Sequence, residues 1–301
     1  MAYTTDKTKT GTGIARHKIE RFDVINISIL MFLAILIIYP FYNCVIVSIT
    51  TQTEYVRTPF MLFPKEVNFD SYKYILGNRG LYFGYRSTLT ILAFGVPLNM
   101  ALTAFGAFVL SRAKFPGKKF FFFMIVVTMF FSGGLIPVYL TIRDLGLSNS
   151  LWSVIFLNGM NTFYFILCRN YMMSIPESME ESAKMDGAND ITVMVRIILP
   201  LCKPILATIL LFYSVDRWNE WFWGMLFIRK DTLIPLQVLL RNIVFISLYE
   251  NRDAAFDSID MFFGDGIKMA VIMVTMLPIM LFYPFVQKYF VRGIMIGAVK
   301  A

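Results

Sequence analysis

The stretch Glu181–Pro204 reads ESAKMDGANDITVMVRIILPLCKP and stands between two apolar segments, each long enough to cross a lipid bilayer. Its first half is polar, and its second half is punctuated by Pro200 and Pro204. A charged amphipathic segment between two spans does not serve the apolar interior of a bilayer, so it needs a partner outside it. We therefore interpret this stretch as a contact surface on one side of a membrane.

The composition around this stretch is that of an integral membrane protein. Hydrophobic residues make up 57% of the 301 residues, and 30 Phe and 19 Met are among them. The net charge of +8 fits basic loops beside an anionic lipid leaflet. No basic patch with interleaved aromatic residues stands out, so membrane lipid is expected as a partner and nucleic acid is not.

Six apolar segments of about 20 residues predict an all-α membrane protein with six transmembrane helices. The segments are 24–49, 87–110, 120–141, 151–168, 205–228 and 267–289. They form one transmembrane domain, 24–290, between a tail at 1–23 and a tail at 291–301. The first tail is polar and basic, and the apolar run after it is too long for a cleavable signal peptide.

Basic residues orient these spans. The loop Ser111–Lys119 carries four Lys or Arg and no acid, whereas the loop 229–266 carries six acids. We therefore expect both termini and the loop 169–203 in the cytosol, and the long loops 50–86 and 229–266 outside. The second outer loop contains LIPLQVLLRNIV, which is too short to span. It can pack on the bundle, lie at the membrane interface or reach an external partner.

The loop 169–203 predicts a helical hairpin. Acids follow Pro176 where the first turn of a helix favours negative charge. Gly187 can end that helix, and Asn189 or Asp190 can cap a second helix that runs to Pro200. An ordinary interfacial hairpin would show the same features. The residues at specific further positions distinguish a partner-binding hairpin from an ordinary interfacial one.

Seven positions match the pattern EAA-x-x-DGA followed, after a fixed gap, by P-x-x-x-P. They are Glu181, Ala183, Asp186, Gly187, Ala188, Pro200 and Pro204. This pattern resembles the coupling loop of bacterial ATP-binding-cassette (ABC) importer permeases, with Ser182 where that family often has alanine. The runs FFSGGLIPVYL (130–140), RWNEWF (217–222) and VRGIMIGAVKA (291–301) are similar to the carbohydrate-uptake class related to the maltose permease, in its complex-oligosaccharide branch.

The resemblance implies a type I importer permease of the bacterial cytoplasmic membrane. Its implied partners are a second permease, two ATPase subunits, an extracytoplasmic solute-binding protein and an oligosaccharide. The helix around Glu181–Gly187 would enter a cleft of one ATPase, where small residues at Ala183 and Gly187 permit close docking. ATP and Mg would be bound by the ATPases. This chain is not expected to be an enzyme or to hold a cofactor or a metal, because it has no P-loop pattern and no ligand cluster.

Polar residues inside the apolar segments are costly against lipid and indicate a protein or water environment. Asp216, Arg217 and Glu220 lie at one-turn spacing or closer, so an internal ion pair can form there. Aromatic and hydrogen-bonding side chains together suit a sugar. The predicted substrate path is Asn158, Tyr164, Trp218 and Asn219. An interfacial aromatic belt is the alternative explanation for the tryptophans.

Three other functions remain as alternatives. Relatives with the same coupling loop carry other solutes, such as a glycerol-phosphate-type compound or a polyamine. A secondary transporter would fit the composition, but the sequence lacks convincing internal repeats. A membrane enzyme finds no support in a nucleophile elbow, a carboxylate pair or a histidine cluster.

Overall fold

The computed structural model of the chain describes residues 21–58, 61–112, 115–249 and 264–298, with side chains placed as far as 245 and then from 264 to 281. All regular structure in these ranges is helical. The all-α prediction is therefore confirmed for the described part of the chain.

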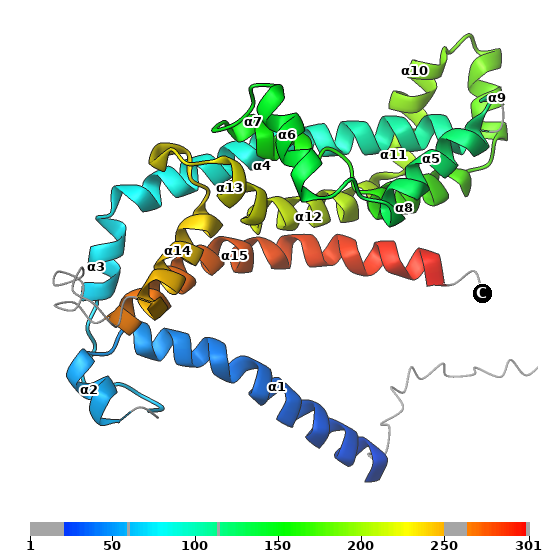
Figure 1. The fold of residues 1–301 in the computed structure, drawn as a ribbon. Helices are drawn as coiled ribbons and strands as arrows, with labels where there is room; N and C mark the ends of the chain where they lie inside the picture. The colour runs from blue at the N-terminus through cyan, green and yellow to red at the C-terminus, as the bar shows by residue number, and fades with distance from the viewer. Residues whose placement is uncertain (1–20, 59–60, 113–114, 250–263, 299–301) are drawn as a thin grey trace, which may run out of the picture.

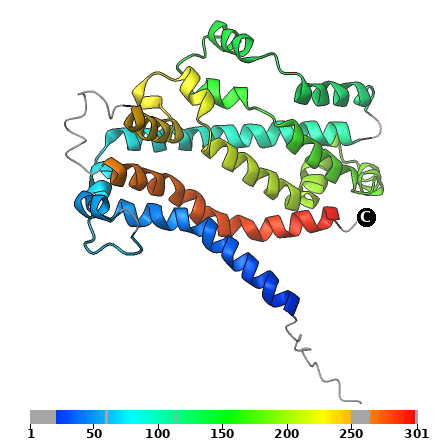
Figure 2. The ribbon, with the colours of Figure 1, turned by 60° about the horizontal axis from the view of Figure 1, so that its bottom comes forward.

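Three helices in the described ranges are long and apolar enough to cross a membrane without interruption. They are α1 (Arg21–Ser48), α4 (Arg79–Ser111) and α15 (Gly264–Ala298). The helices α4, α15 and the shorter α12 (Lys203–Trp218) run side by side and form the centre of the bundle (Figure 1, Figure 2). α1 leaves this bundle, touches α15 near its own end, and buries only its last three residues. Its remaining apolar surface is free to meet lipid or another subunit.

Three further candidate spans are bent pairs of helices. The pair α5 (Lys118–Phe130) and α6 (Leu135–Asp144) is bent by 112°. The pair α7 (Leu151–Leu157) and α8 (Thr162–Met173) is bent by 48°. The third pair joins Asp190–Leu201, from the loop 169–203, to α12 at 82°, so α12 is the part that matches the predicted span 205–228. If each pair counts as one crossing, the described chain has up to six spans.

The sequence predicted spans over 120–141, 151–168 and 205–228, and each of these segments contains a break in its helix that the sequence analysis did not predict. The first breaks at Gly133 and Gly134, and Gly134 has a φ of 87° that only glycine adopts readily. The second breaks because the Asn161 side chain accepts from the backbone N–H groups of Phe163 and Tyr164 and so starts a new helix. The third ends at Trp218 and resumes as α13 (Phe222–Phe227).

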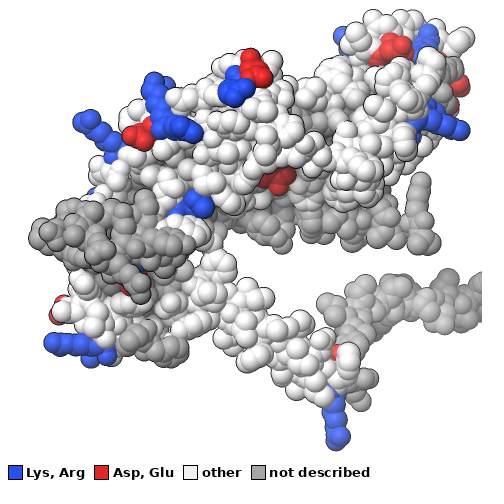
Figure 3. Space-filling view, in the orientation of Figure 1, with Lys and Arg blue, Asp and Glu red and all other residues white. Residues whose placement is uncertain are grey.

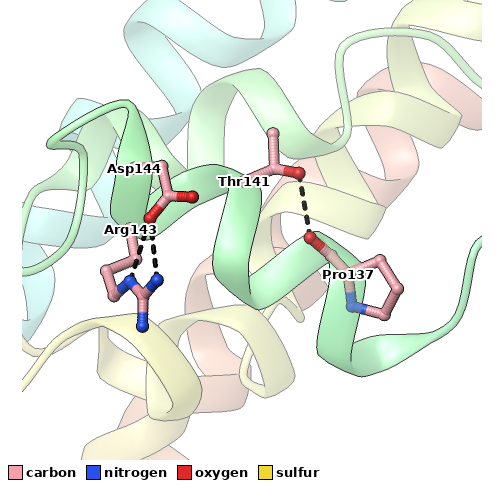
Figure 4. A network of polar contacts seen from close by, with 4 residues as sticks. All are labelled: Pro137, Thr141, Arg143 and Asp144. Carbon is pink, nitrogen blue, oxygen red and sulfur yellow. Dashed lines mark hydrogen bonds and ion pairs between the residues drawn. The ribbon is translucent and has the colours of Figure 1, made fainter.

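The polar side chains in the last turns of α6 form hydrogen bonds (Figure 4). The Thr141 hydroxyl donates to the Pro137 carbonyl at 2.9 Å, one helical turn back. Arg143 donates to the Asp144 carboxylate through Nε and Nη2, and both side chains are more than half exposed. This charged end suits contact with water, as a loop between two spans requires.

The described part of the loop 229–266 packs on the bundle, which is the first of the three alternatives left open by the sequence. Its helix α14 (Leu236–Tyr249) lies against α4 and α15. Leu236 is fully buried, and its N–H donates to the Thr88 hydroxyl at 2.9 Å. A Cβ on Gly84 would lie 3.2 Å from the Leu236 Cα, so this glycine permits the close approach. The other short helices of the outer loops are α2 (Gln52–Arg57), α3 (Asp70–Leu76) and the 3-10 turn η2 (Asp231–Leu233).

Candidate functional site

The predicted hairpin of the loop 169–203 is present, and its first helix ends as glycine allows. Helix α9 (Ser178–Met185) is followed by Gly187 with a φ of 86°. The Gly187 N–H donates to the Lys184 carbonyl and the Ala188 N–H donates to the Ala183 carbonyl, both at 3.0 Å. These two bonds form a Schellman motif, which satisfies the last carbonyls of the helix.

The second arm of the hairpin begins at the predicted N-cap, and its helix changes from α to the wider π form before Pro200. The Asn189 side chain accepts from the Thr192 N–H at 2.8 Å and opens α10 (Asp190–Val193). A π-helical turn, η1 (Met194–Ile198), and the short α11 (Leu199–Leu201) complete the arm. Pro200 offers no N–H and its ring crowds the carbonyl four residues earlier, so a wider turn relieves it. Pro204 lies at the start of α12, where a missing N–H costs little.

The hairpin is fixed to the rest of the bundle by small residues and by charge. Ala183 and Ala188 are half-buried and pack against a core cluster that joins α4, α8 and α12 to Val193, Met194 and Ile198 of the hairpin's second arm. Glu180 is 9% exposed and its carboxylate pairs with Arg112, which follows α4. The exposed Lys184 pairs with Asp190 at 2.6 Å across the hairpin, and this hydrogen bond raises the pKa of Lys184.

The opposite face of the hairpin is open. The predicted coupling residues Glu181, Ser182, Asp186 and Gly187 are exposed there. Met185 is 88% exposed and Ile191 is 70% exposed, so two large apolar side chains project from the hairpin beside its charged and polar residues. Charged groups gather at this end, and uncharged surface separates them from the other charged groups (Figure 3). A rigid hairpin with apolar anchors and a charged rim has the chemistry of a protein-docking surface.

A polar cavity of about 270 Å³ lies where α7 and α8 break beside α12. It is lined by Leu157, Asn158, Met160, Asn161, Tyr213, Asp216, Arg217 and Glu220. Six of these eight side chains are polar or charged, which is rare in an apolar span and typical of a binding or transport site.

Arg217 organises one wall of this cavity. Its side chain is 2% exposed, and Nε donates to the Asn99 side-chain carbonyl at 3.0 Å. Nη1 donates to the carbonyl of Val154 at 2.7 Å, and Nη2 donates to the carbonyls of Ile155 and Asn158, both at 2.8 Å. These carbonyls belong to the end of α7, where helical partners are missing. The guanidinium therefore supplies hydrogen bonds to the backbone carbonyls that are left free where the segment 151–168 breaks.

Arg217 forms no ion pair with a neighbouring carboxylate among the described residues, because its N–H groups donate to backbone carbonyls and to Asn99 instead. Glu220 accepts from the Asn158 side-chain amide at 2.8 Å and from the Trp223 N–H at 3.0 Å. Asp216 accepts from the Tyr164 hydroxyl at 2.9 Å. Charged residues inside a predicted span indicated this site, but their sequence spacing suggested the wrong partners.

The four predicted path residues divide into two groups. Asn158 lines the cavity, and Tyr164 reaches its edge through Asp216. Trp218 is 7% exposed and packs edge-on against Tyr85 in a separate core cluster, with ring centroids 6.2 Å apart. Asn219 is exposed at the end of α12 and is not part of the cavity wall. In this arrangement Trp218 is a packing residue, since an apolar core surrounds its ring.

Comparison with known proteins shows which family the chain resembles in sequence. Residues 88–296 match the family described as the binding-protein-dependent transport system inner membrane component. The polygalacturonan/rhamnogalacturonan transport system permease protein YtcP of Bacillus subtilis (strain 168) is 37% identical over 284 residues, which are 93% of this chain and 98% of that protein. Protein LplC of the same organism is 36% identical over 281 residues, with coverage of 93% and 95%.

A solved structure shows the same architecture. It is described as the crystal structure of a bacterial ABC transporter involved in the import of the acidic polysaccharide alginate. One of its chains superimposes with a TM-score of 0.83 and 32% identity, covering 89% of this chain and 96% of that one. The chain described here therefore belongs to the family of binding-protein-dependent transport system inner membrane components.

Proposed function

We propose that this chain is one of two permease subunits of an ATP-driven, binding-protein-dependent importer of oligosaccharides. The observation that carries the proposal is the hairpin of the loop 169–203. It exposes Met185 and Ile191 at its surface, while Ala183 packs beside the core and Glu180 pairs with Arg112 at the end of α4. A lever of this kind is useful where a second protein moves it. Membership of the permease family supports the same interpretation.

The partners follow from this role. Two ATPase subunits would bind ATP and Mg, and one of them would receive α9 and Gly187 in a cleft. A second permease would complete the pathway, and an extracytoplasmic binding protein would deliver the solute. The start of α1, the end of α15 and the hairpin lie toward one end of the molecule (Figure 1). This arrangement supports cytoplasmic termini on the side of the ATPases.

A saccharide is the favoured solute. YtcP is named for polygalacturonan and rhamnogalacturonan, and the structural neighbour is described as importing alginate. In this chain, Asn158 and Tyr164 at the polar cavity are the proposed contacts of the substrate path, whereas Trp218 and Asn219 lie away from its wall. A glycerol-phosphate-type compound or a polyamine is a second candidate, because the coupling hairpin itself carries no information about the solute.

Reconstitution tests the proposal. The chain is assembled in proteoliposomes with its partner permease and the two ATPases, and labelled oligosaccharides are supplied with the binding protein. We expect accumulation that requires ATP and all subunits. Accumulation that persists without the ATPases and follows an ion gradient would instead identify a secondary transporter. ATP-dependent uptake of a polyamine or a glycerol phosphate, with no saccharide uptake, would replace the proposed solute.

A further inference from the structure

The cavity beside α12 offers hydrogen-bond acceptors rather than free positive charge. The Arg217 guanidinium is buried and already donates four hydrogen bonds, to the Asn99 side chain and to carbonyls of α7 and its break. Its donors are therefore directed into the protein. No Lys or other Arg is present in the described wall of the cavity. An anionic ligand finds no available cation here.

The two carboxylates keep capacity for further donors. Each carboxylate oxygen accepts about two hydrogen bonds. Asp216 is exposed and accepts from Tyr164 through one oxygen. Glu220 is half-buried, accepts from Asn158 and Trp223 and also interacts with the Phe222 N–H, so Asp216 keeps the larger capacity. Hydroxyl groups of a sugar are donors of the required kind, and charge-assisted bonds to carboxylates are strong.

The remaining wall suits the ring of a sugar. Leu157 and Met160 supply apolar surface for its C–H groups, and the exposed Asn161 uses its side-chain oxygen to cap α8, which leaves its amide N–H groups as donors. The volume of about 270 Å³ is open enough to admit several water-sized groups at once. The eight lining residues surround a space on the scale of a single sugar ring, so one glycosyl unit is the part of an oligosaccharide that it would take.

We propose that this cavity binds one uncharged, hydroxyl-rich glycosyl unit of the transported oligosaccharide, and that Asp216 and Glu220 exclude a unit bearing a carboxylate or a phosphate from this position. The inference rests on the proposed function and deepens it. Repulsion between like charges strengthens as the dielectric constant falls, so the half-buried Glu220 discriminates more strongly than it would in water, and the exposed Asp216 adds a weaker repulsion. A uronate-rich chain would have to place its acid groups against other surfaces of the pathway.

The test compares two trisaccharides of equal length, galactotriose and trigalacturonate, in the complete reconstituted importer with its binding protein. Uptake per assembled importer is measured for the wild type, Asp216→Asn and Glu220→Gln. Each variant is expressed relative to the wild type for each sugar, so the selectivity of the unchanged binding protein cancels. Ser214→Ala is the matched control, because this hydroxyl lies on the same helix and donates to the Leu210 carbonyl.

We expect each charge-neutralising variant to lower galactotriose uptake about fivefold, the effect of weakening one hydrogen bond. Trigalacturonate uptake should stay constant or rise, and Ser214→Ala should change neither. Equal changes for both sugars, no change for either, or a wild type that takes up trigalacturonate alone would overturn the inference and leave the proposed function intact. A wild type that takes up the polyamine spermidine and neither sugar would overturn the proposed function as well.

Discussion

Arg112 and Glu180 form a buried ion pair between the end of α4 and the coupling helix α9. The distance between Arg112 Nη1 and Glu180 Oε1 is 2.5 Å, and the two side chains are 13% and 12% exposed. The Nε and Nη2 atoms of Arg112 have no hydrogen-bond partner among the described residues, so Glu180 is the main compensation for this charge. The pair therefore ties α9 to the end of a helix that runs through the centre of the bundle, which is the contact that the proposed coupling would use.

Glu180→Gln should uncouple transport from ATP hydrolysis. Removing one partner of a buried pair leaves an uncompensated charge and costs about 3–5 kcal/mol. The measurement is oligosaccharide uptake per ATP hydrolysed, which a purely structural loss of assembled protein would not change. Asp190→Asn is the control, because it breaks the exposed pair with Lys184 in the same hairpin, and such pairs contribute only about 0–1 kcal/mol.

The reversed pair, Arg112→Glu with Glu180→Arg, separates a specific contact from general damage. It restores opposite charges at the same two positions, so it should recover part of the coupling lost in either single variant. If Glu180→Gln and Asp190→Asn reduce the ratio equally, or if the reversed pair recovers nothing although it assembles, the connection through Arg112 has no special role.

Gly187 should tolerate asparagine better than valine. No other atom lies within 4 Å of the place where a Cβ would stand, so the backbone φ of 86° decides the outcome. Left-handed backbone costs an ordinary residue about 1–2 kcal/mol, and asparagine adopts it more readily than a β-branched residue. Stimulation of ATPase activity by loaded binding protein should thus fall more in Gly187→Val than in Gly187→Asn. Equal loss in both would indicate that side-chain bulk in the ATPase cleft matters instead.

The hairpin could be predicted from the sequence because its signals are local. An N-cap at Asn189, a left-handed glycine at Gly187 and the two prolines each act within a few residues. The direction of Ala183 could not be predicted this way. Its small size is expected to serve ATPase docking, and in this structure it is also half-buried beside a core that includes Val193 and Met194, a contact that depends on how the two arms of the hairpin fold together.

The broken spans were missed because apolar composition does not report continuity. The segment 151–168 has the hydropathy of one helix, yet Asn161 starts a new helix and Arg217 satisfies the carbonyls at the break. Those two residues lie more than 50 positions apart in the sequence. A contact of that range depends on the packing of α12 against α4 and α8, which no local pattern contains.

Arg217→Lys should destabilise the break although it keeps the charge. A lysine ammonium lacks the planar fork that reaches Asn99 and the carbonyls of α7 together. Each buried carbonyl left without a donor costs about 1–3 kcal/mol. The yield of assembled complex and its melting temperature in detergent should both fall, whereas Arg229→Lys on the exposed surface should leave them unchanged. A normal melting temperature in Arg217→Lys would contradict the assigned role of the guanidinium.

The topology can be checked with single cysteines in a background that lacks Cys44, Cys168 and Cys202. A cysteine at Asp190, on the exposed hairpin, should resist an impermeant thiol reagent added outside intact cells and react after lysis. A cysteine at Asp144, at the exposed end of α6, should react in intact cells. Labelling of the hairpin from outside would reverse the proposed orientation.

Trp218 should matter for folding rather than for transport. Its ring is buried among Ile75, Leu236 and Val271 and lies edge-on to Tyr85, so no sugar reaches it in this arrangement. Truncation of a buried tryptophan to alanine costs about 3–5 kcal/mol, because a large cavity remains. Trp218→Ala should therefore lower the amount of assembled importer, Trp218→Phe should lower it less, and uptake per assembled importer should stay near that of the wild type. Trp221, which is 42% exposed, is the matched control, and its truncation should leave assembly intact. If Trp218→Ala assembles normally but loses uptake, the ring contacts the sugar in another state of the transport cycle, and the packing role assigned here is insufficient.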